Sequence, residues 1–139
     1  MHKVISTLVL GASLTLGGCQ QQIVKEAPLS KVELGPSSSN FIQVTSERAG
    51  IASSNLLRAG MSGINTSQAS KELRYRFVWF DRDGFEINDL SSRWQYRTLP
   101  PKERFSLEMI ATNPKSADYL IRIYDNARKS SNHSKGIEE

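Results

Sequence analysis

The stretch LRYRFVWFD, residues 73–81, decides the fold of this 139-residue chain. Every second residue from Leu73 to Trp79 is large and apolar or aromatic, which places these side chains on one face of a β-strand. Aromatic residues also favour strands over helices. The sequence DRDG follows as a turn, because Gly84 can adopt a positive φ, and residues 85–87 then begin a return strand.

This pattern predicts which side chains of the strand are buried. We expect Tyr75, Phe77 and Trp79 in the core, because they share one face, and Arg74 and Arg76 on the opposite, outward face.

Similar alternation recurs along the chain and indicates an all-β domain. Short turn-bounded segments are predicted as further strands at residues 41–44, 51–64, 94–97, 105–111 and 119–123. Six or seven short strands of this kind favour an antiparallel β-sandwich. The alternative is a small α+β domain with a helix over residues 49–59.

The amino terminus has the features of a secretory signal peptide. A start containing Lys3 is followed by an uncharged apolar run over residues 4–16. This run is too short for a membrane-spanning helix, which needs about 20 apolar residues. We therefore expect residues 1–18 to be removed as a lipoprotein signal peptide.

The end of this run resembles the lipobox of bacterial lipoproteins: Leu16, Gly17, Gly18 and Cys19. The resemblance implies a diacylglycerol on the Cys19 thiol, cleavage before this residue and stable anchoring to a membrane by more than one acyl chain. No other cofactor is expected. In the lipoproteins that this segment resembles, Asp after the cysteine favours retention in the inner membrane. Because Gln20 stands there instead, the resemblance implies that the protein is anchored in the outer membrane of a Gram-negative bacterium, with the domain facing the periplasm.

Composition divides the remaining chain into three parts. Residues 19–40 carry the lipidated cysteine and are polar and broken by proline and glycine, as in a flexible tether. Residues 41–125 contain the predicted β-sandwich. Residues 126–139 lack aromatic side chains and are expected to be a disordered tail.

The domain also resembles a family of bacterial lipoproteins, the YcfL-like family. The residues that carry the resemblance are Leu73–Phe77, Trp79–Asp81, Gly84–Glu86, Trp94, Leu99, Glu103, Ala111 and Tyr119–Ile123, together with the lipobox. The resemblance implies a small periplasmic β-sandwich of immunoglobulin-like type. It implies no catalytic residue, since the family is itself uncharacterised.

The residues offer no catalytic or metal-binding constellation. Of the two histidines, His2 leaves with the signal peptide and His133 lies in the expected tail, so nucleophile systems lack a base and zinc sites lack ligands. A calcium loop starting at Asp81 fails because its twelfth position is Ser92 rather than glutamate. We therefore expect no enzyme and no metal site. The modest net charge of +4, on scattered residues, also argues against nucleic acid.

The outward face of the long strand is the candidate partner-binding surface. A solvated strand face would be polar throughout, yet apolar Val78 and Phe80 follow Arg74 and Arg76 on this face. Apolar anchors with arginines around them are typical of protein interfaces. The alternative is that another part of the chain covers the apolar pair. The full candidate set is Arg74, Arg76, Val78, Phe80, Trp94 and Arg122, although Trp94 also suits a core position.

Three functional hypotheses follow. The favoured one is a non-enzymatic, lipid-anchored module that docks on another cell-envelope protein in an accessory or assembly role. The second is a binder of an anionic envelope polymer such as peptidoglycan, using arginines and Trp94. The weakest is a cell-wall glycan hydrolase built on paired carboxylates around residues 81–89.

Overall fold

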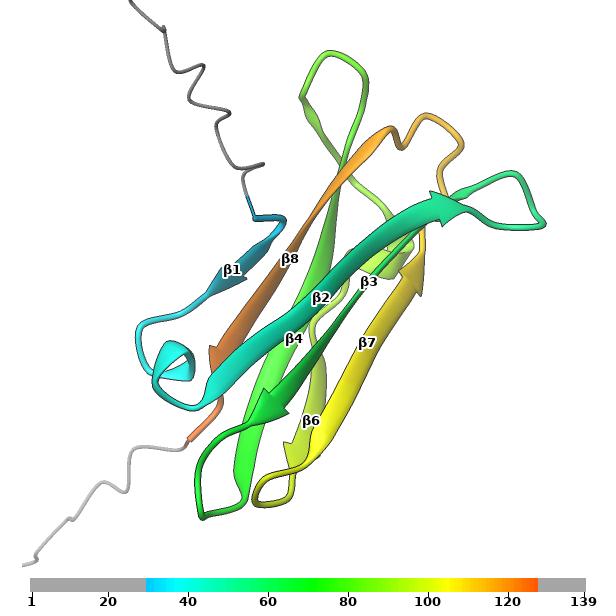
Figure 1. Cartoon of the computed structure of the whole chain (residues 1–139). Helices are drawn as coiled ribbons and strands as arrows, with labels where there is room; N and C mark the ends of the chain where they lie inside the picture. Colours follow the sequence, from blue (N-terminus) through cyan, green and yellow to red (C-terminus); the bar gives the residue numbers. More distant parts are fainter. Residues whose placement is uncertain (1–29, 128–139) are drawn as a thin grey trace, which may run out of the picture.

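Two β-sheets face one another in the computed structural model of the chain, which describes residues 30–127 (Figure 1). This confirms the β-sandwich predicted from the sequence. The strands of this part of the chain are β1 (Val32–Leu34), β2 (Ile42–Ile51), β3 (Leu57–Asn65), β4 (Lys71–Phe80), β5 (Glu86–Ile87), β6 (Gln95–Leu99), β7 (Arg104–Ile110) and β8 (Asp118–Asp125). Two short 3₁₀ helices, η1 (Ser38–Asn40) and η2 (Leu90–Ser92), lie in connections.

The five-stranded sheet is built around β4. Its order is β1-β8-β4, and both β5 and β6 pair with the other side of β4. The three-stranded sheet has the order β2-β3-β7. Neighbouring strands run antiparallel except β1 and β8, which are parallel.

The core lies between the sheets and confirms the predicted inward face of β4. Phe77 and Trp79 are fully buried, and their rings stack with centroids 5.9 Å apart. The indole N–H of Trp79 donates a hydrogen bond to Ser91 Oγ at 2.8 Å, which satisfies the polar end of this buried ring. Tyr75 was expected to be equally buried but is only partly so, because its hydroxyl reaches Gln95 at the sheet edge.

The turn after β4 is formed as the sequence predicted. The carboxylate of Asp81 accepts hydrogen bonds from the backbone N–H groups of Asp83 and Phe85, at 2.9 and 3.0 Å. Gly84 adopts a φ of 85°, a conformation that residues with a Cβ rarely adopt.

Asp89 fastens the connection between β5 and β6 to the loop between β7 and β8. This residue is 4% exposed, and its carboxylate accepts hydrogen bonds of 2.8 Å from the backbone N–H groups of Ser91, Thr112 and Asn113. The hydroxyls of Ser91 and Thr112 donate to it as well. Burial alone would raise the pKa of Asp89, but these hydrogen bonds outweigh burial and hold it below its ordinary value. The clamp positions the segment that leads to Trp94.

Two expectations about chain organisation need correction. The domain begins before residue 41, because Val32–Leu34 form β1 in register with Ile121–Ile123 of β8 and therefore do not belong to a flexible tether. The alternative helix over residues 49–59 is wrong. That segment contains the end of β2, a turn and the start of β3, which pair as a hairpin. The predicted signal peptide, Cys19 and residues 128–139 of the expected tail lie outside the described residues.

Candidate functional site

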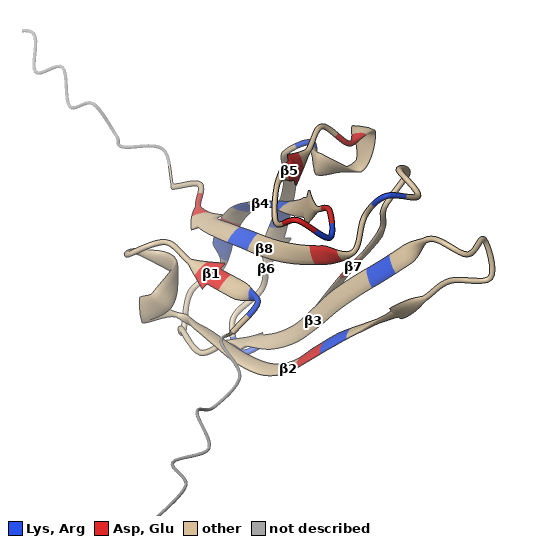
Figure 2. Cartoon of the chain, turned by 90° about the horizontal axis from the view of Figure 1, so that it is seen from above, with Lys and Arg blue, Asp and Glu red and all other residues tan. Residues whose placement is uncertain are grey.

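The outer face of the five-stranded sheet carries the arginines that the sequence singled out. Since Leu73, Phe77 and Trp79 face the core, alternation places Arg74 and Arg76 on the side of β4 away from the other sheet. Arg76 lies directly across from Arg122 of β8. Figure 2 shows these two strands side by side, with basic residues on both.

The apolar half of the predicted surface is covered by the protein itself. Val78 is fully buried and Phe80 is partly buried. β4 is an interior strand in which Val78 lies directly opposite Leu120 of β8, and η2 also contacts β4. Val78 therefore belongs to the protein interior and is withdrawn from the candidate surface.

Trp94 lies on this outer face rather than in the core. It stands immediately before β6, and 36% of it is exposed. The guanidinium carbons of Arg74 and Arg76 lie 5.0 and 5.1 Å from its ring centroid, within cation–π range. The core interpretation of Trp94 is therefore wrong, and the ring holds the two arginines.

Tyr124 of β8 completes this group. Its ring meets Trp94 edge-on, with centroids 5.7 Å apart, and the Arg74 guanidinium carbon lies 5.6 Å from the Tyr124 ring centroid. We call Arg74, Arg76, Trp94 and Tyr124 the arginine–aromatic cluster. Tyr124 was not among the residues predicted from the sequence, although its position two residues after Arg122 places both side chains on the same face of the strand.

Glu33 of β1 contributes a carboxylate that contacts Tyr124 of the cluster and the neighbouring Arg122. Glu33 accepts hydrogen bonds from Arg122 Nε at 3.1 Å and from the Tyr124 hydroxyl at 2.9 Å. The Tyr124 hydrogen bond, helped by Arg122, lowers the pKa of Glu33 despite the opposing effect of burial. The same hydrogen bond raises the pKa of Tyr124. Glu33 was missed because the sequence assigned it to the tether.

Arg74 and Arg76, in contrast, make no ion pair within 4.0 Å in the described residues, although Arg76 also helps to lower the pKa of Glu33. Within residues 30–127, the ion pairs closer than 4.0 Å involve other cations, and Arg122 is paired with Glu33. The Nε atom of Arg76 is buried without a hydrogen-bond partner in this part of the chain. Leaving a donor so buried is unfavourable by about 1–3 kcal/mol. Arg74 and Arg76 therefore contact aromatic rings but pair with no carboxylate within 4.0 Å in this part of the chain.

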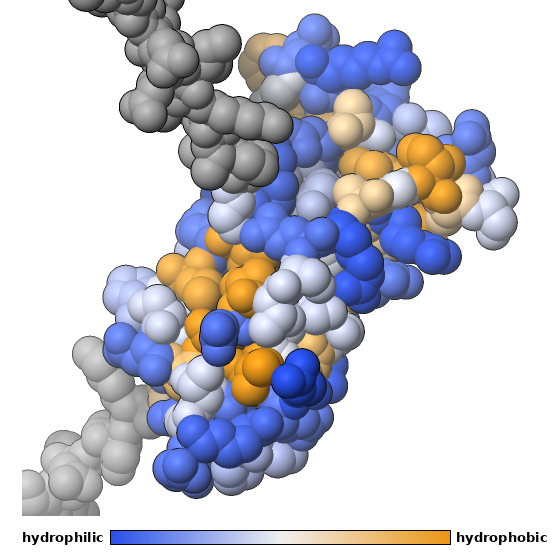
Figure 3. All heavy atoms as spheres, viewed as in Figure 1, coloured by the Kyte–Doolittle hydropathy of each residue, from blue (hydrophilic) through white to orange (hydrophobic). Residues whose placement is uncertain are grey.

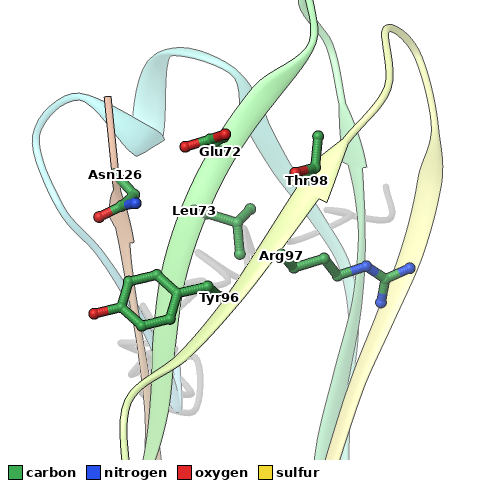
Figure 4. A pocket seen from close by; sticks show the side chains of 6 residues that line it. All are labelled: Glu72, Leu73, Tyr96, Arg97, Thr98 and Asn126. Carbon is green, nitrogen blue, oxygen red and sulfur yellow. The ribbon is translucent and has the colours of Figure 1, made fainter. Parts of the chain in front are cut away.

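Exposed aromatic surface continues onto β6. Tyr96, which lies opposite Arg74 in the β4–β6 pair, is 66% exposed. In Figure 4 its ring extends to the same side of β6 as Asn126, which lines the same shallow pocket, whereas Arg97 extends from the other side of β6. Arg97 donates to the carbonyl of Ser106 on β7, so it connects the sheets and lies outside the candidate surface.

Apolar surface elsewhere is less organised. Figure 3 shows hydrophobic atoms reaching the surface near β1 and the start of β2, where Val32, Leu34 and Val44 are partly buried against the core.

Residues 30–127 contain no group of three His, Cys, Asp or Glu side chains arranged to hold a metal ion. No helix within the same residues is long and apolar enough to cross a membrane.

Comparison with known proteins gives family and fold. A family model described as a protein of unknown function, DUF1425, matches residues 31–125. The crystal structure of a DUF1425 family member from Shewanella sp. PV-4 is similar, with a TM-score of 0.54 and 22% identity over 59% of this chain and 75% of that chain. The crystal structure of Campylobacter jejuni Cj0090 is also similar, with a TM-score of 0.58 and 24% identity. The match covers 68% of this chain and 97% of that chain. A search of curated proteins found no significant match. At these identities the likeness to the two structures shows the fold alone.

Proposed function

The chain belongs to the DUF1425 family of proteins of unknown function, and we propose that it is a non-enzymatic interaction module that docks on another protein of the bacterial cell envelope. The observation that carries this proposal is the arginine–aromatic cluster. Arginine and large aromatic residues are enriched in protein interfaces and dominate their binding energy. Here two arginines without ion pairs lie on Trp94, with Tyr96 exposed beside them.

The proposal includes a lipid anchor and a place in the envelope. The lipobox-like Leu16, Gly17, Gly18 and Cys19 support a YcfL-like lipoprotein, and Gln20 supports the outer membrane with the domain in the periplasm. The sequence alone supports this part. Replacing Cys19 by Ala is expected to abolish labelling with radioactive palmitate and leave an uncleaved precursor. Continued labelling of this variant would refute the anchor.

The docking itself is tested by chemical crosslinking in living cells followed by mass spectrometry. The wild-type chain is expected to give a reproducible adduct with an envelope protein. The double variant Arg74→Glu, Arg76→Glu is expected to lose this adduct, while Arg48→Glu, Arg58→Glu on the three-stranded sheet retains it. An adduct that survives the first double variant and is lost in the second would place docking on the other sheet.

A second candidate function is binding to an anionic envelope polymer such as peptidoglycan. It is favoured by the exposure of Trp94 and Tyr96, because aromatic rings with nearby arginines also suit a carboxylate-bearing glycan. Purified sacculi separate the two functions. The docking proposal predicts that the purified chain in neutral detergent stays in the supernatant. Sedimentation with protein-free sacculi that is lost in Arg74→Glu, Arg76→Glu would favour the polymer.

A further inference from the structure

β6 is an outermost strand of the five-stranded sheet, on the side next to the arginine–aromatic cluster. Among the described strands it pairs with β4 alone, and its register against β4 is regular over all five of its residues. Successive residues of a strand direct their backbone N–H and C=O groups to alternate sides. The side of β6 away from β4 is therefore an open sheet edge.

The hydrogen bonds of β4 identify which residues of β6 face this edge. The C=O group of Glu72 accepts a hydrogen bond of 2.8 Å from the backbone N–H of the residue that follows β8. The next residue, Leu73, therefore bonds toward β6, and Arg97 opposite it bonds back to β4. By alternation, the N–H and C=O groups of Tyr96 and Thr98 point to the open edge. There they bond to no other backbone group of residues 30–127.

The neighbouring edge strand of the other sheet is protected, in contrast. The backbone C=O of Ser106 in β7 accepts a hydrogen bond of 2.9 Å from the Arg97 guanidinium. Proteins commonly cover or interrupt exposed sheet edges in this way, because free edges invite pairing with another chain. β6 contains no proline, glycine or bulge, and its exposed side chains, Tyr96 and Thr98, favour strands. Its edge can therefore accept a further strand.

This edge is continuous with the proposed docking surface. Tyr96 lies opposite Arg74 of the cluster, and Trp94 immediately precedes β6. Figure 4 shows Tyr96 on one side of β6 and Arg97 on the other. A strand added to β6 would direct every second side chain to the outer face, beside the exposed Tyr96. A partner that contacts the cluster thus meets free backbone groups next to it.

The outer edge of β2 is longer but less suited to this role. Its register against β3 shifts between Val44 and Ser46. The side chain of Glu47 accepts hydrogen bonds from the Ser30 hydroxyl and the backbone N–H of Lys31, so the start of the described chain lies against this strand. Bulges and charged side chains protect sheet edges from pairing. The β2 edge also belongs to the other sheet, away from the cluster.

We propose that docking adds an extended segment of the partner protein to the open edge of β6. Main-chain hydrogen bonds to Tyr96 and Thr98 then supplement the side-chain contacts with the cluster, as in other cases of strand addition. The segment presents an aromatic or β-branched side chain beside Tyr96, because such cross-strand pairs stabilise neighbouring strands. The inference rests on the proposed docking function and names the form in which the partner binds.

The first test measures the in-cell adduct of the full-length chain in two variants at one position. Thr98→Pro removes an N–H group from the open edge and none from the ladder with β4, whereas Thr98→Ala keeps that group. We expect the adduct yield to fall roughly tenfold or more in Thr98→Pro, because a main-chain hydrogen bond is lost and the ring obstructs the added strand. Thr98→Ala is expected to retain the adduct.

The matched control is Ala49→Pro on β2. Ala52 donates its N–H to Leu56 across the hairpin, so by alternation the N–H of Ala49 points to the outer edge of β2. This variant is expected to keep the adduct. Circular dichroism melts of the purified full-length variants in neutral detergent establish that each one is folded.

A second readout is independent of the proline variants. A photoreactive phenylalanine analogue is placed at Tyr96 and, in separate cells, at Thr98, and the crosslinked partner residues are identified by mass spectrometry. Because both side chains lie on one face of β6, we expect crosslinks about two positions apart in one partner segment.

The outcomes separate this inference from docking itself. Crosslinks to unconnected segments of the partner, or equal adduct yields from Thr98→Pro and Thr98→Ala, would overturn strand addition and leave docking in place. Loss of the adduct in Ala49→Pro but not in Thr98→Pro would assign the added strand to β2 and overturn the choice of β6. Absence of any adduct from the wild-type chain contradicts the docking proposal and this inference with it.

Discussion

Arg76 of β4 lies directly opposite Arg122 of β8, so two positive side chains face each other across an antiparallel strand pair. Like charges in this position are unfavourable. Glu33 neutralises Arg122 but makes no ion pair with Arg76, whose Nε is also buried without a partner. Natural proteins keep such local conflicts mainly at functional sites. Arg76 is therefore retained at the expense of stability, which agrees with its proposed binding role.

The first prediction concerns this conflict. Arg76→Leu is expected to raise the free energy of unfolding by roughly 1 kcal/mol, because relief of the unpaired donor and of the like-charge pair outweighs the lost cation–π contact. Urea unfolding of the wild type and the variant measures the change. The control Arg58→Leu, which loses only an exposed ion pair with Glu108, is expected to change stability little. A loss of more than about 1 kcal/mol in Arg76→Leu would contradict this account.

The second prediction concerns the Asp89 clamp. Asp89→Ala leaves five donors in Ser91, Thr112 and Asn113 without their acceptor and is expected to lower the free energy of unfolding by roughly 3 kcal/mol or more. Asp83→Ala, in an exposed turn, is the matched control. A change below about 1 kcal/mol in Asp89→Ala would mean that the clamp does not fasten this connection.

The third prediction concerns acid stability. Because the pKa of Glu33 lies below its ordinary value of 4.5 in the folded protein, its carboxylate contributes stability above that value and loses it as the pH falls through the folded pKa. Asp89 behaves in the same way below its ordinary value of 3.8. Unfolding free energies measured between pH 7 and about pH 3 are expected to fall more steeply for wild type than for Glu33→Gln. Parallel curves for the two proteins would rule out this role of Glu33.

The fourth prediction separates core from surface. Phe77→Ala is expected to destabilise by about 3–5 kcal/mol, the usual range for a buried aromatic. Val78→Ser is expected to cost about 2 kcal/mol or more, because one fully buried methyl group is lost and a hydroxyl replaces the other. Phe85→Ala and Tyr96→Ser remove exposed rings and are expected to have little effect. Thermal unfolding of the wild type and the four variants measures these differences in stability. A mild effect of Val78→Ser would return Val78 to the candidate surface.

The sequence predicted the sandwich because alternation in residues 73–79 is strict and the following turn is marked by Gly84. It placed Arg74 and Arg76 correctly on the outer face for the same reason. It could not show that Val78 is covered, because that depends on which segments flank β4. Nor could it identify Glu33: β1 has three residues, and its partners on β8 lie almost ninety residues away in the chain. Local patterns carry no information on such pairings.

The central claim, that the outer face of the five-stranded sheet docks on an envelope protein, is tested most directly by a photoreactive phenylalanine analogue in living cells. Placed at the exposed Tyr96, the analogue is expected to give one dominant protein adduct on illumination, and Arg74→Glu with Arg76→Glu is expected to abolish it. Placed at Arg48 on the three-stranded sheet, it is expected to give none. An adduct formed from the Arg48 position alone, or a Tyr96 adduct that persists after both charge reversals, would contradict the account.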